Sequence, residues 1–297
     1  MTTMETNQAK PDLRDATVVA DLFNEAAEAN LAFELRRGAV IDLPDQGHML
    51  ITGDLHDHRM NFAKAVRFAN LAKMPGNHLL LQELIHGERL VNGMDLSYRT
   101  AAEAAALQLQ YPGRVHVLLS NHELAQINGE DIAKHGISSI DAFHAGLEYV
   151  FGEDADVVHD AYAEWIRSLV LAVRCENGLF CAHSLPAPRK RADFDPMVLT
   201  RDLTDSDLLG PNGSAHLMVW GRNLAQGWAD DLATLWNTEQ FVLGHQHAEM
   251  GYELCGDTML ILASDHEHGV CLPVNLQQPY SRAELVDAIL PFAAMSE

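Results

Sequence analysis

Hydrophobic and polar positions follow two different periodicities in the first 120 residues. Long stretches carry apolar side chains at helical spacing, and short unbroken apolar runs lie between them. Such runs are typical of strands that are buried on both faces, as in a parallel sheet. Gly38 follows the first helical stretch and predicts its end. The pattern predicts helices over residues 15–37, 60–73 and 95–110, and strands over residues 48–52, 78–81 and 115–119.

The pattern changes in the second half of the chain. Residues 130–170 are predicted to be helical, and short strand-like runs follow them. Asn177-Gly178 and Gly256-Asp257 are tight-turn signals, so this half is predicted to form a second, mixed or antiparallel sheet that faces the first. Residues 186–216 are rich in Pro, Asp, Gly and charge, which predicts an irregular excursion over the active face. The predicted strands cover residues 169–174, 179–182, 241–243, 251–254, 259–263 and 270–276.

These elements predict an α/β fold in which two facing mixed β-sheets form a central sandwich flanked by helices. A chain of 297 residues with 47% hydrophobic content can bury a large core. Its length favours one domain over residues 15–297, preceded by a polar tail over residues 1–14.

Composition limits the partners of the protein. A formal net charge of -22 repels nucleic acid and anionic membrane surfaces, so neither is expected to bind. The N-terminus lacks the order of a secretory signal, and no apolar run reaches the roughly 18 residues that span a membrane. We expect a soluble, cytoplasmic protein. The cysteines stand singly in apolar segments and are expected to be buried free thiols: Cys175, Cys181, Cys255 and Cys271.

Potential metal ligands follow five of the apolar strands. A pair of metal ions needs about eight protein ligands of mixed carboxylate, amide and imidazole type, and the sequence supplies about that number. His266 and His268 form a further His-x-His pair, which is expected to border the substrate rather than bind metal. The five groups are Asp54-Leu55-His56, Glu83 with His86, Asn121-His122-Glu123, His183, and His245-Gln246-His247.

The order of these groups resembles the calcineurin-like metallophosphoesterase superfamily, whose motifs run GDxH, GDxxDRG, GNHE, a lone His and GHxH. This chain has GDLH at 53–56, QELIHG at 82–87, SNHE at 120–123, CAHS at 181–184 and GHQH at 244–247. Four of the five match well. The flanking segments CAHSLPAP, VWGRN and FVLGHQHAEMGYEL resemble the phosphoprotein phosphatase branch, so the resemblance covers residues 48–276.

The resemblance implies a metallophosphoesterase fold with two metal ions, which Mn, Fe or Zn would suit. It also implies that a hydroxide between the metals attacks phosphorus, while His122 protonates the leaving group as general acid. Asp54 and His56 would hold the first metal, with His247 as a further ligand, Glu83 would take the bridging position, and Asn121, His183 and His245 would hold the second metal.

The second motif departs from the family pattern at three positions. Glu83 replaces the bridging Asp, which shifts the carboxylate by about one carbon-carbon bond and alters metal affinity. His86 replaces the Asp that orients the catalytic His, so reduced catalytic power is expected. Gly87 replaces the Arg that binds the phosphate. Arg222, in a Trp-Gly-Arg-Asn turn, is the preferred substitute among Arg89, Arg99, Arg189, Arg191 and Arg222.

The sequence therefore predicts hydrolysis of a phosphate monoester, either a phosphorylated small molecule or a protein phosphoserine or phosphothreonine. A phosphodiester or nucleotide hydrolase is the alternative among enzymes. A catalytically weakened metal-binding sensor or scaffold is the alternative outside enzymes, and the altered second motif favours it. His122 favours an enzyme, because pure metal binding does not need an imidazole that is not a ligand.

Overall fold

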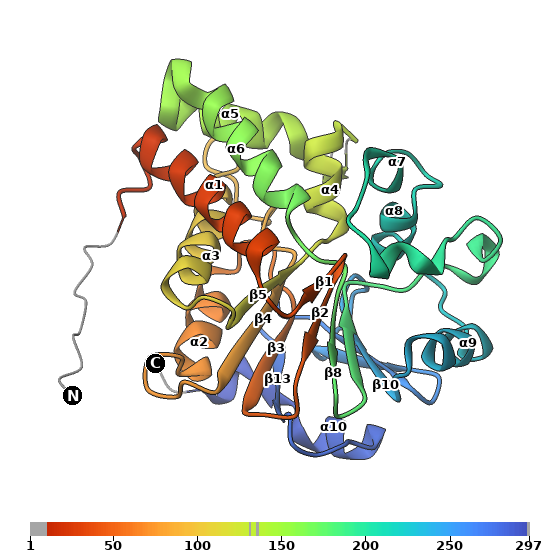
Figure 1. Cartoon of the computed structure of the whole chain (residues 1–297). Coiled ribbons are helices and arrows are strands. Elements are labelled where there is room, and N and C mark those ends of the chain that lie inside the picture. The colour runs from red at the N-terminus through yellow and green to blue at the C-terminus, as the bar shows by residue number, and fades with distance from the viewer. Residues whose placement is uncertain (1–10, 131, 135–136, 296–297) are drawn as a thin grey trace.

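Short strands that are apolar on both faces form two β-sheets that pack face to face. The computed structural model describes residues 11–130, 132–134 and 137–295, so residues 1–10 of the predicted polar tail lie outside the described part. Helices cover the outer faces of the two sheets (Figure 1). The predicted fold class, two mixed sheets flanked by helices, is confirmed.

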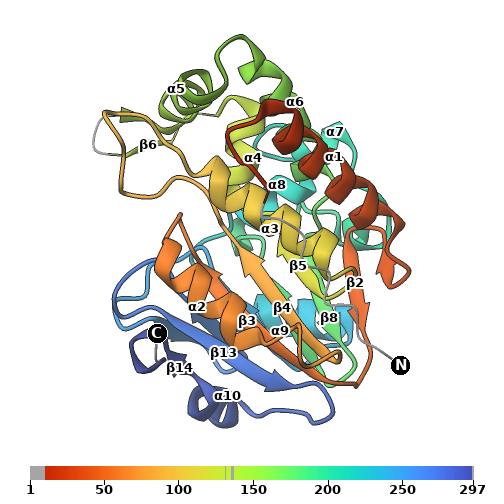
Figure 2. The same cartoon turned by 90° about the vertical axis from the view of Figure 1, so that its left-hand side faces the viewer.

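The first sheet is built from the strand-helix units of the N-terminal half. Its strand order is β14 (Leu290–Pro291), β13 (Val270–Asn275), β3 (His48–Asp54), β4 (Asn77–Gln82) and β5 (Val115–Leu118). β3, β4 and β5 run parallel, and β13 pairs antiparallel with β3. The helices α2 (Arg59–Ala69) and α3 (Tyr98–Gln110) connect the parallel strands and lie on the outer face of this sheet (Figure 2).

The second sheet contains most strands of the C-terminal half. Its order is β1 (Arg36–Arg37), β2 (Val40–Leu43), β8 (Ala172–Cys175), β9 (Leu179–Ala182), β10 (Gln240–Leu243), β12 (Met259–Leu262) and β11 (Tyr252–Cys255). β9, β10 and β12 run parallel. The pairs β8–β9 and β11–β12 are antiparallel hairpins, closed at the predicted turns Asn177-Gly178 and Gly256-Asp257.

The remaining elements surround the sheets. α1 and α6 pack against each other on one side, and α9 lies on the other side of the molecule (Figure 1). No helix in the described part of the chain is long and apolar enough to cross a membrane. The elements are α1 (Ala16–Ala32), α4 (Asn121–Asn128), β6 (Ala133–Lys134), β7 (Ile137–Ser138), α5 (Ser139–Phe151), α6 (Ala155–Arg167), α7 (Asp205–Leu208), α8 (Ser214–Val219), α9 (Gln226–Trp236), α10 (Arg282–Ala288), and 3-10 turns at Gly152–Asp154, Pro188–Lys190, Pro196–Thr200 and Phe292–Ala294.

Successive residues of the central strands face two different cores. Ile51 and Leu80 lie in the core between the sheets, whereas their sequence neighbours Leu50 and Leu79 lie in the core beneath the helices. Full burial of one such side chain contributes about 1.5–3 kcal/mol to folding, so both faces of each strand favour the sandwich. This double burial is the physical reason for the unbroken apolar runs in the sequence.

The predicted first helix is wrong at its C-terminal end. α1 ends at Ala32 instead of residue 37, and the backbone of Phe33 is extended. Arg36–Arg37 then pairs with β2 around Gly38, which is a turn residue with φ of +62° and not a helix stop. A Cβ at Gly38 would collide with the backbone of Arg201, so a contact distant in sequence selects this turn.

Four other segments differ from their predictions. Residues 130–170 contain α5 and α6 together with the antiparallel strand pair β6 and β7, and residues 95–97 precede α3 instead of belonging to it. Residues 186–216 contain short helices and 3-10 turns. Residues 270–276 form β13, which joins the first sheet and not the second. Local hydrophobicity identifies a buried strand, but the partner of that strand is set by contacts far away in the sequence.

The four cysteines are free, as predicted. Three of them are buried, and burial raises the pKa of the Cys175 and Cys271 thiols to about 12. Cys255 is only half-buried, so the prediction of burial is wrong there. Thiols that stay protonated are poor nucleophiles and poor metal ligands.

The approach of the two sheets gives a first testable prediction. Gly53 in β3 faces β12, and a Cβ there would collide with the backbone of Leu262. Gly53→Ala should therefore lower the free energy of unfolding by about 1–3 kcal/mol through overpacking. Gly227→Ala is the control, because no atom lies within 4 Å of its Cβ position in α9. Urea unfolding should show no loss for the control, and equal stability of both variants would contradict the prediction.

Candidate metal site

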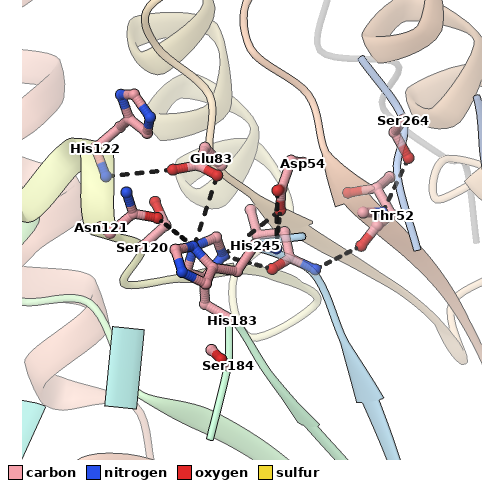
Figure 3. A network of polar contacts seen from close by, with 12 residues as sticks. Thr52, Asp54, Glu83, Ser120, Asn121, His122, His183, Ser184, His245 and Ser264 are labelled. Atoms are coloured by element: carbon pink, nitrogen blue, oxygen red, sulfur yellow. Dashed lines mark hydrogen bonds and ion pairs between the residues drawn. The ribbon is translucent and has the colours of Figure 1, made fainter. Parts of the chain in front are cut away.

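Five strand ends meet at one edge of the sandwich and deliver the predicted ligands there. Parallel strands end at the same edge of a sheet, and the two sheets place these edges side by side. Two isolated bridges, Asp54 to Ala263 and Leu118 to Val170, join the sheets at this edge. Figure 3 shows the result, with polar side chains from both sheets in one network. The ligands lie at the end of β3 (Asp54) or after β4 (Glu83), β5 (Asn121), β9 (His183) and β10 (His245).

Strained backbone is concentrated in these loops. Apart from four asparagines, the residues other than glycine with positive φ in the described part of the chain are His56, Asp57, Glu83, His86 and His245. Their φ angles lie between +41° and +68°, in the left-handed region that such residues rarely adopt. Strain of this kind costs of order 1–3 kcal/mol per residue and persists mainly at functional sites. The positions of the candidate ligands are therefore held by the fold at an energetic cost.

Asn121, His183 and His245 present their donor atoms to one point. Asn121 Oδ1 lies 2.8 Å from His183 Nε2 and 2.7 Å from His245 Nδ1. His183 Nε2 lies 3.6 Å from Glu83 Oε2. Ligand atoms about 2.1 Å from a shared ion are separated by roughly 3–3.5 Å, so these four atoms are close to the arrangement of one coordination sphere.

Glu83 connects this group to the rest of the site. Within the described residues, two triads have ligand atoms within 4.8 Å of one another, namely Asp54–Glu83–His183 and His56–Glu83–His122. His56 Nε2 lies 3.6 Å from Glu83 Oε2, and its Nδ1 contacts Ile85 O at 3.0 Å. Glu83 is the residue that the two triads share. His122 is also within reach of a metal in this geometry.

Burial makes the two acidic ligands hard to ionise. Burial raises the pKa of Asp54 to about 7, although the backbone N–H of His245 donates to its carboxylate at 2.8 and 3.0 Å. Burial, followed by the charge of Asp54, raises the pKa of Glu83 well above its ordinary value. The carboxylate of Asp265 adds further negative charge beside Asp54. Buried carboxylates of this kind are stabilised by bound cations, so the electrostatics fit a metal site.

Gln82 fixes the tautomer of His183. Gln82 Nε2 donates to Thr52 O at 2.9 Å, so Gln82 Oε1 is left to accept from His183 Nδ1 at 2.9 Å. Burial lowers the pKa of His183 well below its ordinary value, and the ring is neutral. Nε2 of His183 then carries a lone pair that faces the oxygen of Asn121, another acceptor. A cation between two such acceptors makes the contact favourable, so the donor set fits a metal ion.

His245 has the character of a metal ligand as well. Burial lowers the pKa of its imidazole to about 3, which leaves the ring neutral. Its Nε2 is buried without a hydrogen-bond partner among the described residues. Gly244 makes the close approach possible, because a Cβ there would collide with the side chains of Asp54 and Gln82.

Glu123 connects the second motif (residues 82–87) to the third (residues 120–123) through hydrogen bonds. Its carboxylate accepts from the backbone N–H of Leu84 at 2.7 Å and from the hydroxyl of Ser120. The backbone N–H of His122 donates to Glu83 Oε1 at 3.2 Å. These contacts fix the loop that follows β4 against the start of α4, which sets the distance between Glu83 and Asn121.

The remaining predicted residues lie at the margin of this cluster. Arg222 is exposed, and its charge contributes to the lowered pKa of His183 and His245 after the effect of burial. The described part of the chain gives Arg222 no hydrogen bond or ion pair. His247 is exposed, with its ring centroid 5.8 Å from that of His266, and belongs to neither triad. Its role as a ligand stays a prediction.

Sequence reasoning missed three residues of the site. Gln82 orients His183, Asp265 lies beside Asp54, and Asp95 binds His86 Nδ1 at 2.8 Å. Gln82 directly precedes Glu83 at a strand end, and this position was an available signal. Asp95 had no such signal, because the local pattern assigned it to a helix.

The raised pKa of Asp54 gives a prediction for the metal-free protein. Its folded-state pKa is about 7 against an ordinary value of 3.8, so its contribution to stability is lost as pH rises through this interval. Asp54→Asn should therefore raise the melting temperature relative to wild type by more at pH 8 than at pH 5. Mn²⁺ should stabilise the wild type more than the variant.

Asp207→Asn is the matched control for this experiment. Hydrogen bonds from Arg201 lower the pKa of Asp207 to about 2, so its carboxylate is charged at both pH values. This control should lose stability at pH 5 and pH 8 alike. A melting difference between Asp54→Asn and wild type that is the same at both pH values would contradict the assignment.

Comparison with known proteins agrees with this fold. No protein-family model matches the sequence, and no curated protein matches it. Among solved structures, a protein serine/threonine phosphatase from Saccharomyces cerevisiae, described as similar to human phosphatase PP5, is 15% identical. The superposition has a TM-score of 0.68 and covers 95% of this chain and 91% of that chain.

A second solved structure is the cold-active protein-tyrosine phosphatase of a psychrophilic Shewanella species. It is 12% identical, with a TM-score of 0.51, and the match covers 83% of this chain and 81% of that chain. At these identities the likeness concerns the fold alone. The chain has the fold of the yeast phosphatase over nearly its whole length, as the motif resemblance predicted.

Proposed function

We propose that the protein hydrolyses phosphate monoesters at this site with two bound metal ions. The observation that carries the proposal is the position of Glu83, whose carboxylate belongs to both triads of potential ligands. Five strand ends from two sheets converge on it. The phosphatase fold of the yeast protein supports the same reaction class.

The chain's own residues would hold the metals in two groups. The metals would supply positive charge that activates water and stabilises the transition state. Mixed carboxylate, amide and imidazole donors suit Mn, Fe or Zn. Asp54 and His56 would bind the first metal, with His247 as the further ligand that the sequence implies; Glu83 would bridge; and Asn121, His183 and His245 would bind the second.

His122 is the proposed general acid. Its backbone N–H is held by Glu83, and its ring lies edge-on to the ring of His56, with centroids 4.9 Å apart. An imidazole beside the metals is placed to give a proton to the departing alkoxide. The triad with His56 and Glu83 also allows metal ligation by His122, and metal content separates the two roles.

Arg222 is the proposed phosphate-binding cation. It lies near His183 and His245 and is not paired with an acidic side chain in the described part of the chain. Two other candidates are engaged elsewhere: Arg191 forms an ion pair with Asp231 at 2.8 Å, and Arg99 lies over the ring of Tyr98. A guanidinium can bind two phosphate oxygens at once.

The proposed substrate class is a phosphoprotein or a small phosphorylated molecule. The yeast neighbour acts on phosphoserine or phosphothreonine according to its name, which supports the first. A net charge of -22 would attract a substrate with basic residues around the phosphate. A phosphodiester or a nucleotide is the alternative, and it is tested by offering both ester types to one preparation.

The first test of function combines metal content with turnover. Wild type purified with Mn²⁺ should contain two metals per chain and hydrolyse p-nitrophenyl phosphate. His122→Ala should lower kcat for phenyl phosphate, whose leaving group needs a proton, by about 100-fold and should keep both metals, because the general acid is not a ligand. His144→Ala, on α5, is the control and should match wild type.

The other outcomes of this test are equally informative. Loss of one metal from His122→Ala would assign His122 as a ligand and not as the acid. Two metals without turnover of any phosphate ester in the wild type would favour the metal-binding sensor over the enzyme. Metal-free wild type would overturn the metal site itself.

Arg222 is tested through substrate affinity. Arg222→Ala should raise KM for p-nitrophenyl phosphate by about 10-fold or more, since a charge-assisted contact to the phosphate is lost. Arg191→Ala is the matched control, because its guanidinium is already paired with Asp231. Steady-state kinetics decide between them, and a larger effect from Arg191→Ala would contradict the assignment.

A further inference from the structure

We propose that Asp95 and His86 are positioning residues for His122, which hold its ring in the orientation that protonates the leaving group. The inference rests on the proposed function of His122 as general acid. It assigns a role to two buried residues that belong to neither triad of potential ligands.

Asp95 and His86 form a closed hydrogen-bonded unit. Asp95 Oδ2 contacts His86 Nδ1 at 2.8 Å, and the two side chains are only 4% and 3% exposed. Asp95 Oδ1 accepts from the backbone N–H of Ser97 at 2.8 Å. Ser97 Oγ in turn accepts from the backbone N–H of His86 at 3.1 Å. The orientation of the His86 ring is therefore determined by three mutually supporting contacts.

The carboxylate also determines the tautomer of His86. An ionised Asp only accepts hydrogen bonds, so His86 must donate from Nδ1. In a neutral ring Nε2 is then an acceptor. Carboxylates that contact imidazoles in this way fix both ring orientation and tautomer, and their loss reduces the function of the imidazole.

The fixed His86 ring in turn restricts the orientation of the His122 ring. It lies edge-on between two rings, with centroids 5.5 Å from His122 and 5.7 Å from Phe143 of α5. Phe143 is fully buried and packs edge-on against the His86 ring. One side of the His122 ring therefore contacts the imidazole of His86, and Asp95 fixes the position of that imidazole.

Backbone packing holds the unit against the site. The backbone N–H of Asp95 donates to Ala142 O of α5 at 2.9 Å, and a Cβ at Gly146 would collide with the backbone of Asp95. His86 adopts a φ of +62°, and a Cβ at Gly87 would collide with the backbone of His56. The strained backbone of His86 and the close contact at Gly87 together place His86 beside His122.

The test compares two substrates that depend differently on the general acid. Phenyl phosphate has a strongly basic leaving group that needs a proton, whereas the leaving group of p-nitrophenyl phosphate needs little protonation. In the full-length, Mn²⁺-loaded protein, Asp95→Asn and His86→Gln should lower kcat for phenyl phosphate by about 10- to 100-fold. The loss on p-nitrophenyl phosphate should be several-fold smaller, and KM should stay unchanged.

A double mutant tests whether the unit acts through His122. Asp95→Asn combined with His122→Ala should be no slower than His122→Ala alone, because both changes remove the same contribution. Asp207→Asn is the matched control, a buried carboxylate paired with Arg201, and should not distinguish the substrates. Equal losses on both substrates, or additive losses in the double mutant, would overturn the proposal.

A spectroscopic measurement keeps the proposal testable without turnover. In Zn²⁺-loaded, ¹⁵N-histidine-labelled protein, Asp95→Asn should change the ring nitrogen shifts of His122 as well as those of His86. Unchanged His122 shifts would overturn the positioning role. Wild type that hydrolyses neither ester would refute the proposed function instead, and the shifts of His122 would then decide the inference alone.

Discussion

The carboxyl group of Glu83 is buried where the two sheets meet, and the potential ligands of both triads lie around it. Glu83 is 2% exposed and lies beside Asp54, another buried carboxylate. Placing two such groups together in a protein interior is costly unless cations offset the charge. The surrounding histidines are kept neutral by burial, so they cannot provide that charge themselves. Protonation, which the raised pKa values of Asp54 and Glu83 favour, removes this cost in the metal-free protein, and the metal ions that we propose would remove it in the loaded protein.

The fold holds this arrangement in place through rigid contacts at the edge where the sheets meet. Gly53 and Gly244 allow backbone and ligands to approach closely, and neither position has room for a side chain. Glu123 then fixes the loop after β4 to the start of α4. The left-handed backbone at Glu83 and His245 is maintained by these contacts. Strain in the ligand loops is thus balanced by packing in the sandwich, which buries apolar side chains on both faces of its strands.

The altered second motif, at residues 82–87, has a different interpretation once the contacts of the loop that carries Asp95 are included. In the sequence, His86 stands where a carboxylate is expected, and a loss of catalytic power follows. In the fold, the carboxylate of Asp95 contacts His86, and the His86 ring lies edge-on to the His122 ring. The longer side chain of Glu83 is accommodated by a left-handed backbone and by a hydrogen bond from His122 N–H. Glu83 and His86 thus both contact His122, one through its backbone and the other through its ring.

The sequence by itself determined the strands, the order of the motifs and the ligand types at the strand ends. These features are local: unbroken apolar runs indicate buried strands, and Asp54, Asn121 or His183 directly follow such runs. Tertiary structure alone decided the rest. It placed β13 in the first sheet, turned residues 36–43 into a hairpin, and brought Gln82 to His183 and Asp95 to His86. These outcomes depend on hydrogen bonds and close packing between segments far apart in the chain, and local periodicity carries no information about such pairs.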